Sequence, residues 1–225
     1  MKLEKVKLKV KGILLDFDGT IVDSREAYLE AAKAAFAAIG RKMVNVKVAT
    51  EIPRRLEQNL SINNLIRGID AQKFLDVYLN AYYQVTSIKA KPMPNVSETL
   101  KKLSQKTKLA LITMRRVPKE KVIKELQKSG LAKHFQLVIT ALDTHHPKPS
   151  PEALIKCARQ LGIQMDKCAV VGDSVADVKA GKTAGMKTIA VLSGIFTREE
   201  LEGEKPDLIL KSVNELPDFL EYSGK

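Results

Sequence analysis

Short apolar runs alternate with helical patterns along most of this 225-residue chain, and this alternation limits the folds available to it. Segments with helix-spaced apolar residues separate the runs, which are GILLDF (12–17), LALIT (109–113), LVIT (137–140), CAVVGD (168–173), TIAVL (188–192) and DLIL (207–210). Such alternation is typical of a parallel sheet covered by helices. We therefore predict an α/β fold with a Rossmann-like parallel sheet core and helices on both faces.

The stretch from about residue 22 to residue 90 interrupts this alternation, because its pattern is wholly helical. Asp23 and Glu26 resemble a capping box that opens the helix REAYLEAAKAAFAAI, and Gly40 closes it. KPMP at 91–94 then ends the helical pattern. We predict a core formed by residues 1–21 and 91–225, with residues 22–90 inserted as a small all-helical domain.

Charge and composition exclude several classes of protein. The formal net charge is +12, but the lysines are scattered among glutamates in segments such as PKEKVIKELQK, so we expect no nucleic-acid partner. No apolar run approaches the roughly 20 residues of a membrane-spanning helix, and the first residues lack a signal-peptide pattern. Cys157 and Cys168 lack partners at metal-ligand spacing, so we expect them to be buried apolar residues. We expect a cytoplasmic protein without a membrane partner.

Four aspartates follow two of the predicted strands. Asp16 and Asp18 end the first strand, Asp173 ends the fourth, and Asp177 lies about one helical turn later. Such residues can simply cap backbone donors in turns. Because the carboxyl ends of parallel strands share one sheet edge, however, the carboxylates should converge, and they need a cation to stay ionised together. Oxygen ligands without His or Cys favour Mg²⁺.

Two groups of the opposite kind are predicted at the same edge. LALIT ends in the hydroxyl of Thr113, and Lys148 lies in the proline-rich loop after LVIT. A lone threonine usually satisfies backbone and a lone lysine is usually solvated. Facing a metal-bound carboxylate cluster, the two would clamp a phosphate, and the chemistry that fits is phosphoryl transfer.

DFDGT, Thr113, Lys148 of KPSP, and GDSVAD, in this order at strand ends, resemble the four motifs of the haloacid dehalogenase superfamily. The helical insertion resembles that superfamily's cap domain, so the resemblance covers the whole chain. MPNVSETLKKL, GLAKHFQLVIT and DVKAGKTAGMKTIAVLSG are also similar to phosphoglycolate-phosphatase-like members. The resemblance implies a hydrolase of this subgroup with a helical cap that closes over its substrate.

The resemblance also implies roles for single residues. Asp16 is expected to be the nucleophile, and Asp18 the general acid and then the general base. Mg²⁺ is expected on the carboxylates of Asp16 and Asp173 and on the main-chain carbonyl of Asp18. Thr113 and Lys148 are expected to bind phosphoryl oxygens. Dehalogenases and phosphonate-cleaving members do not carry an aspartate at the position of Asp18, which favours phosphate esters.

Asp177 is expected to orient the lysine or metal-bound waters. The second motif departs from the pattern of many relatives, in which Asn follows the Thr; here Met114 follows Thr113. Arg115 and Arg116 come next and are candidates for contact with a second anionic group of the substrate, although both can equally be surface residues.

The expected function is that of a Mg²⁺-dependent phosphatase that hydrolyses a small phosphomonoester through an aspartyl-phosphate. The expected partner is a small phosphorylated metabolite, and the expected state is a monomer or homodimer. The alternatives are a sugar phosphomutase of the same superfamily, and a basic phosphate- or nucleic-acid-binding protein on an inactive scaffold. Candidate substrate contacts from the insertion are Arg54, Arg55, Arg67 and Lys89.

Overall fold

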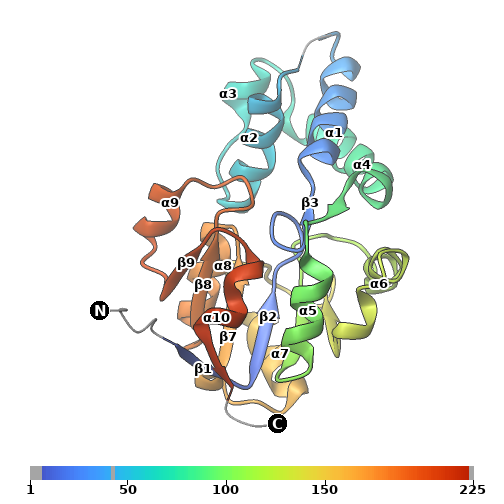
Figure 1. Cartoon of the computed structure of the whole chain (residues 1–225). Helices are drawn as coiled ribbons and strands as arrows, with labels where there is room; N and C mark the ends of the chain where they lie inside the picture. The colour runs from blue at the N-terminus through green and yellow to red at the C-terminus, as the bar shows by residue number, and fades with distance from the viewer. Residues whose placement is uncertain (1–6, 42–43, 223–225) are drawn as a thin grey trace. The chain divides into compact units, whose positions relative to one another are not determined.

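The computed structural model describes residues 7–41 and 44–222, and the chain divides into two compact units (Figure 1). The first unit comprises Met1–Ile21 and Pro92–Lys225, and the second comprises Val22–Lys91. The expectation of no signal peptide rests in part on residues 1–6, which lie outside the described residues. Within the described part of the chain, no helix combines the length and the apolar character needed to cross a membrane.

A parallel six-stranded sheet, as far as the described residues show, forms the centre of the first unit, and its order is β6-β5-β2-β7-β8-β9. Its strands are β2 (Gly12–Leu15), β5 (Lys108–Ile112), β6 (Leu137–Ile139), β7 (Cys168–Gly172), β8 (Lys187–Val191) and β9 (Leu208–Leu210). Each predicted apolar run supplies one of these strands. The predicted α/β fold with a parallel sheet is therefore confirmed.

β2 is the central strand, and it pairs in register with β5 on one side and β7 on the other. Leu15 lies opposite Leu111 of β5 and Val171 of β7. All four residues of β2 are buried, which explains why GILL is apolar without alternation. A separate parallel pair, β1 (Leu8–Val10) with β10 (Leu220–Tyr222), was not predicted, because a charged residue in the middle of each, Lys9 and Glu221, leaves no apolar run.

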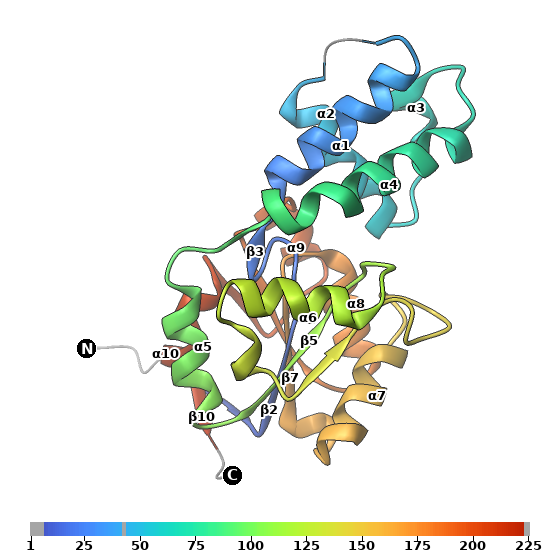
Figure 2. The same cartoon turned by 90° about the vertical axis from the view of Figure 1, so that its right-hand side faces the viewer.

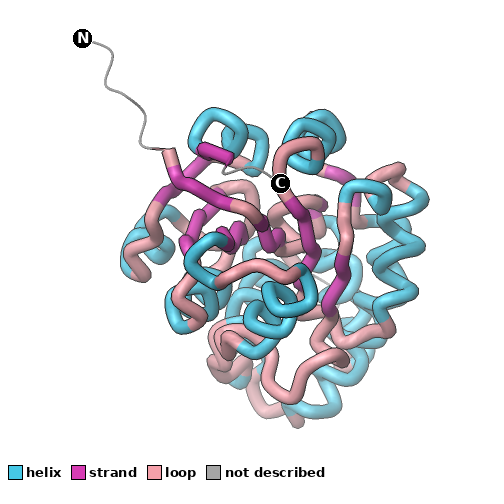
Figure 3. Tube along the Cα trace, turned by 90° about the horizontal axis from the view of Figure 1, so that it is seen from below, coloured by secondary structure: helices cyan, strands magenta, loops and turns pink. Residues whose placement is uncertain are grey.

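Helices cover both faces of the sheet, as Figures 2 and 3 show, with α5 and α10 on one side of β2 and α7 on the other in Figure 2. On the α7 side, Leu14 and Val170 of the sheet pack against Cys157 of α7 and Ala180 of α8. Cys157 and Cys168 are free and buried, as expected. The helices are α5 (Val96–Ser104), α6 (Lys119–Lys128), α7 (Glu152–Leu161), α8 (Val175–Thr183), α9 (Arg198–Gly203) and α10 (Leu216–Phe219).

The second unit is built mainly from α1 (Arg25–Ala38), α2 (Val46–Glu57), α3 (Asn63–Ile66) and α4 (Ala71–Lys89). α1 packs along α4, where the rings of Tyr28 and Tyr82 stack with centroids 5.4 Å apart and Phe36 meets Phe74 edge-on at 5.0 Å. α1 ends before Gly40, which has a φ of +76°, so the predicted closing glycine is confirmed.

The predicted cap of α1 is wrong. Asp23 lies in the two-residue strand β3 (Val22–Asp23), which pairs with β4 (Lys91–Pro92), and Ser24 is the residue that precedes the helix. The Asp23 carboxylate instead binds the guanidinium of Arg25, with Nε 2.9 Å from Oδ1. The same carboxylate also accepts from the backbone N–H of Arg25 at 3.1 Å, but Glu26 pairs with Lys89 and Lys91, so the predicted box of Asp23 and Glu26 is not formed. The stretch from residue 22 is therefore not wholly helical.

Candidate active site

The carboxyl ends of three adjacent strands bring polar residues to one edge of the sheet. Asp16 directly follows β2, Thr113 follows β5 and Asp173 follows β7. The winding of the chain changes direction here, because β5 and β6 lie on one side of β2 while β7, β8 and β9 lie on the other. Ligands of open α/β sheets bind at such a switch point. All residues of this edge belong to the first unit.

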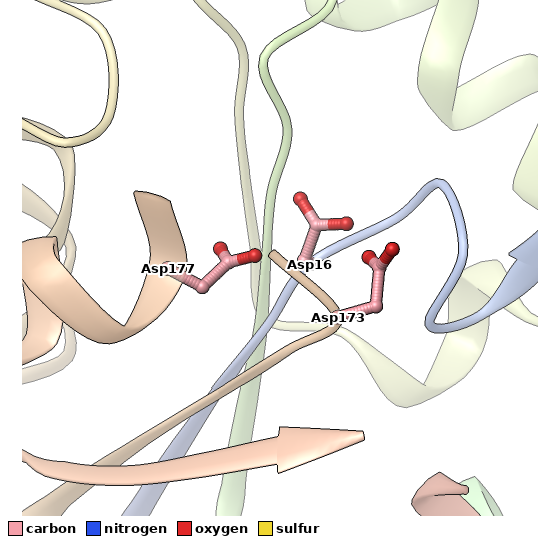
Figure 4. Close-up of side chains that lie close together, drawn as sticks. All are labelled: Asp16, Asp173 and Asp177. Carbon is pink, nitrogen blue, oxygen red and sulfur yellow. The ribbon is translucent and has the colours of Figure 1, made fainter. Parts of the chain in front are cut away.

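Asp16, Asp173 and Asp177 form a buried group of carboxylates, with ligand oxygens within 4.8 Å of one another (Figure 4). Lys148 touches two of them, since its Nζ donates to Asp16 Oδ1 at 2.5 Å and to Asp177 Oδ1 at 2.6 Å. One ammonium does not balance three carboxylates, and buried charges require compensation. This group has the oxygen donors and the surplus negative charge to bind a divalent metal ion such as Mg²⁺.

Burial and charge act on Asp16 and Lys148 in opposite directions. Burial raises the pKa of the Asp16 carboxyl from 3.8 to about 7, against the lowering effect of the nearby Lys148 ammonium. Burial alone would lower the pKa of Lys148, but Asp16 and Asp177 outweigh it and hold that pKa above its usual range. Lys148 is therefore cationic at neutral pH, while Asp16 titrates close to neutrality.

Asp177 joins the site to the first turn of α8. Its Oδ2 accepts from the Ser174 hydroxyl at 2.7 Å and from the Ser174 backbone N–H at 3.3 Å, which forms a capping box with the bond from Asp177 N to Ser174 Oγ. Its Oδ1 accepts from Lys148. Asp177 is therefore both a capping residue and an anchor for the lysine.

Asp173 is enclosed by residues that leave little room around its carboxylate. The Thr20 hydroxyl donates to its Oδ1 at 3.4 Å, and the backbone N–H of Ile195 donates to its Oδ2 at 3.3 Å. A Cβ on Gly19 would lie 2.5 Å from Oδ2, and a Cβ on Gly194 would lie 1.6 Å from it. Gly19 also has a φ of +80°. Both positions therefore require glycine for this carboxylate to stay where it is.

Asp18 interacts with a different cation. The guanidinium of Arg115 donates through Nε to Asp18 Oδ2 and through Nη2 to Asp18 Oδ1, both at 2.7 Å. Its Nη1 donates to Glu125 of α6 at 2.6 Å. The sequence offered Arg115 as a candidate for substrate contact, whereas in the structure this buried side chain contacts two carboxylates of the chain itself.

The remaining predicted residues have more ordinary surroundings. Thr113 is buried, its N–H donates to the carbonyl of Ile139 at 3.0 Å, and its hydroxyl accepts from the N–H of Arg115 at 3.2 Å. Arg116 is exposed. In the second unit, Arg54 and Arg55 pair with Glu51, Lys89 pairs with Glu26, and Arg67 is exposed. Their contact with a substrate stays a prediction.

Sequence reasoning missed Thr20, Ser174, Gly194 and Glu125. Thr20 directly follows the DFDG run, and Ser174 stands three residues before Asp177, the spacing of a capping box, so both carried a signal. Gly194 lies two residues after a predicted strand, and a glycine at such a place is a weaker signal of close packing. Glu125 lies in an ordinary amphipathic helix, and nothing local distinguishes it from its neighbours.

Comparison with known proteins gives concordant matches. The family model described as haloacid dehalogenase-like hydrolase matches residues 13–191. The chain is 32% identical to a phosphoglycolate phosphatase of Vibrio vulnificus strain CMCP6, over 96% of this chain and 98% of that protein. It is 27% identical to the phosphoglycolate phosphatase of Escherichia coli K12, over 92% of this chain and 91% of that protein.

A solved structure shares the fold. It is a hydrolase of the haloacid dehalogenase-like family from Streptococcus pneumoniae, which superposes with a TM-score of 0.78 and 16% identity over 92% of this chain and 97% of that one. The family model spans most of the chain, including both strand ends that supply the acidic group. The resemblance inferred from the motifs is confirmed: this chain belongs to the haloacid dehalogenase-like hydrolases.

Proposed function

We propose that this protein is a Mg²⁺-dependent phosphatase that hydrolyses a small phosphomonoester through an aspartyl-phosphate on Asp16. The main support for the proposal is the buried Asp16 carboxylate, which contacts the Lys148 ammonium and belongs to the same cluster of carboxylates as Asp173. The relatives named phosphoglycolate phosphatase support a small phosphorylated acid as the substrate.

The donor set fits a hard divalent cation. Asp16 and Asp173 would hold Mg²⁺ through their carboxylates, together with the main-chain carbonyl of Asp18. Both oxygens of Asp177 already accept from Lys148 and Ser174, which favours a role in orienting the lysine. When bound, Mg²⁺ would neutralise charge on the phosphoryl group and align it with the nucleophile.

In the first half-reaction, an oxygen of Asp16 attacks phosphorus and the bond to the ester oxygen breaks. Asp18 gives its proton to that departing oxygen. In the second half-reaction, Asp18 takes a proton from water, whose oxygen attacks phosphorus, and phosphate leaves with the Asp16 carboxylate restored. Lys148 and the Thr113 hydroxyl bind phosphoryl oxygens throughout, because an ammonium and a hydroxyl stabilise the charge that builds up on them.

The second unit, Val22–Lys91, would serve as the family's helical cap domain, which excludes water from the reaction. Specificity within the small phosphorylated acids would then depend on cap residues, for which Arg54, Arg55, Arg67 and Lys89 are the candidates.

The test is turnover of para-nitrophenyl phosphate and of phosphoglycolate by the purified protein, with Mg²⁺ and with EDTA. We expect activity that needs Mg²⁺ and falls by at least about 10³-fold in Asp16→Asn. Asp166→Asn is the matched control, because Asp166 is an exposed aspartate that pairs with Lys167. This control should retain full activity.

Turnover that survives EDTA or Asp16→Asn would contradict the proposal. Activity only in the presence of a trace sugar bisphosphate would replace it with the phosphomutase alternative. Absence of turnover on these and on a panel of sugar phosphates, nucleoside monophosphates and pyrophosphate, combined with salt-dependent nucleic-acid binding, would favour the inactive binding protein.

A further inference from the structure

Arg115 binds both carboxylate oxygens of Asp18 at once. Its Nε and Nη2 each lie 2.7 Å from one of the two oxygens, which is the paired arrangement in which a guanidinium holds a carboxylate in one fixed orientation. A single lysine ammonium in that place could not fix the plane of the carboxylate in the same way. The orientation of the Asp18 side chain therefore depends on Arg115.

Arg115 is itself fixed by contacts on other sides. Nη1 donates to Glu125 Oε2 at 2.6 Å, and the guanidinium carbon lies 4.5 Å from the centroid of the Phe17 ring. Its backbone N–H donates to the Thr113 hydroxyl at 3.2 Å. The side chain is 3% exposed. Helix α6, the turn after β5 and the segment after β2 thus hold Arg115 in a defined position.

Stability alone gives a weak reason for this arrangement. Burying a guanidinium between two carboxylates carries a desolvation cost that the ion pairs offset only in part, and apolar residues of similar volume are often as stable. Orientation of a reacting group gives a stronger reason, because proton transfer requires the carboxylate within hydrogen-bond reach of the reacting oxygen. Asp18 directly precedes Gly19, which has a φ of +80°, so it lies where the chain turns sharply.

We propose that Arg115 is a positioning residue for Asp18, and that Glu125 holds Arg115 in place for that task. This inference rests on the proposed function, in which Asp18 exchanges protons with the leaving oxygen and with water. Arg115 acts through Asp18 and does not bind the substrate.

The test compares Arg115→Met and Arg115→Lys in the wild-type and the Asp18→Asn backgrounds. One substrate is para-nitrophenyl phosphate, whose leaving group needs little protonation, and the other is an alkyl phosphate, whose leaving oxygen needs a proton. In the wild-type background, Arg115→Met should lower kcat on the alkyl ester by about 10- to 100-fold, part of what acid–base catalysis supplies. The loss in the rate of aspartyl-phosphate formation should be smaller on the aryl ester, because only that half-reaction depends on the leaving group. KM should stay within about twofold on both substrates, since Arg115 does not touch substrate.

In the Asp18→Asn background, Arg115→Met should change kcat by no more than about twofold, because the group it positions is already lost. Arg115→Lys should restore part of the activity. Arg198→Met is the control, since Arg198 is an exposed arginine paired with Glu202 at 3.2 Å, and it should match the wild type. A cooperative thermal unfolding transition checks that each variant is folded. If Arg115→Met does not fold, Glu125→Gln takes its place, and the same loss is expected on the alkyl ester.

Equal losses in both backgrounds, or a raised KM with unchanged kcat, would overturn the positioning role while leaving the phosphatase intact. Equal losses on the two esters in the rate of aspartyl-phosphate formation would also overturn it, because a general structural defect does not distinguish leaving groups. A wild type without Mg²⁺-dependent turnover on any phosphate ester would overturn the proposed function and this inference with it.

Discussion

Lys148→Met should destabilise the metal-free protein strongly, because it removes the cation between two buried carboxylates. The Lys148 side chain is 3% exposed, and it binds Asp16 at 2.5 Å and Asp177 at 2.6 Å. Removal of one partner from a buried ion pair costs about 3–5 kcal/mol. For a chain of 225 residues this lowers Tm by roughly 6–20 °C, at about 2–4 °C per kcal/mol.

The assay is thermal unfolding followed by circular dichroism in EDTA at pH 8. Lys179→Met is the matched control, because Lys179 forms an exposed ion pair with Glu204 at 3.2 Å and should cost about 0–1 kcal/mol. The cost of Lys148→Met should shrink at pH 5, where the Asp16 carboxyl can keep its proton. If Lys148→Met costs no more than Lys179→Met at pH 8, the buried lysine does not provide the compensation described here.

Two further outcomes follow from the same site. Gly194→Ala puts a Cβ 1.6 Å from Asp173 Oδ2 and displaces this proposed metal ligand. Mg²⁺-dependent turnover should fall by about 100-fold, the cost of misplacing a group of the site by about 1 Å. Gly203→Ala, with nothing within 4 Å of its added Cβ, should match the wild type in the same assay. In EDTA, Asp16 should contribute to the free energy of unfolding an amount that falls as pH rises from about 4 to about 7. The reason is that the folded carboxyl, with a pKa of about 7, keeps a proton that the unfolded carboxyl releases near 3.8. The slope should be at most about 1.4 kcal/mol per pH unit. Urea titrations at each pH should find this slope reduced in Asp16→Asn, and an unchanged slope would contradict the assignment.

The sequence was sufficient to predict the sheet and its acidic edge. Apolar runs buried on both faces leave a continuous signal, and parallel strands necessarily end at one edge. An aspartate that directly follows such a run, as Asp16 and Asp173 do, can therefore be placed without knowledge of the strand order. The same rule places Lys148 near this edge, because its loop follows the parallel strand that ends at Ile139.

The remaining contacts depend on distances that no local pattern contains. The bond between Arg115 and Asp18 joins residues 97 positions apart, and it needs the register of β2 against β5 before it can be seen. The need for glycine at position 194 arises from a single oxygen of Asp173 in another segment. The Asp23 cap failed for a related reason, since pairing of a two-residue strand overrides a capping preference and leaves no periodic signal.

The central position of β2 has a consequence for synthesis on the ribosome. Leu15 ends this apolar strand, yet its second neighbour is complete only at Gly172, 157 residues later, which takes roughly 8 to 30 seconds at about 5–20 residues per second. The insertion Val22–Lys91 is continuous and can fold during that interval, while β2 lacks one or both of its neighbours. The nascent chain therefore exposes GILL longer than any other strand of the described sheet, and chaperone binding should be concentrated there.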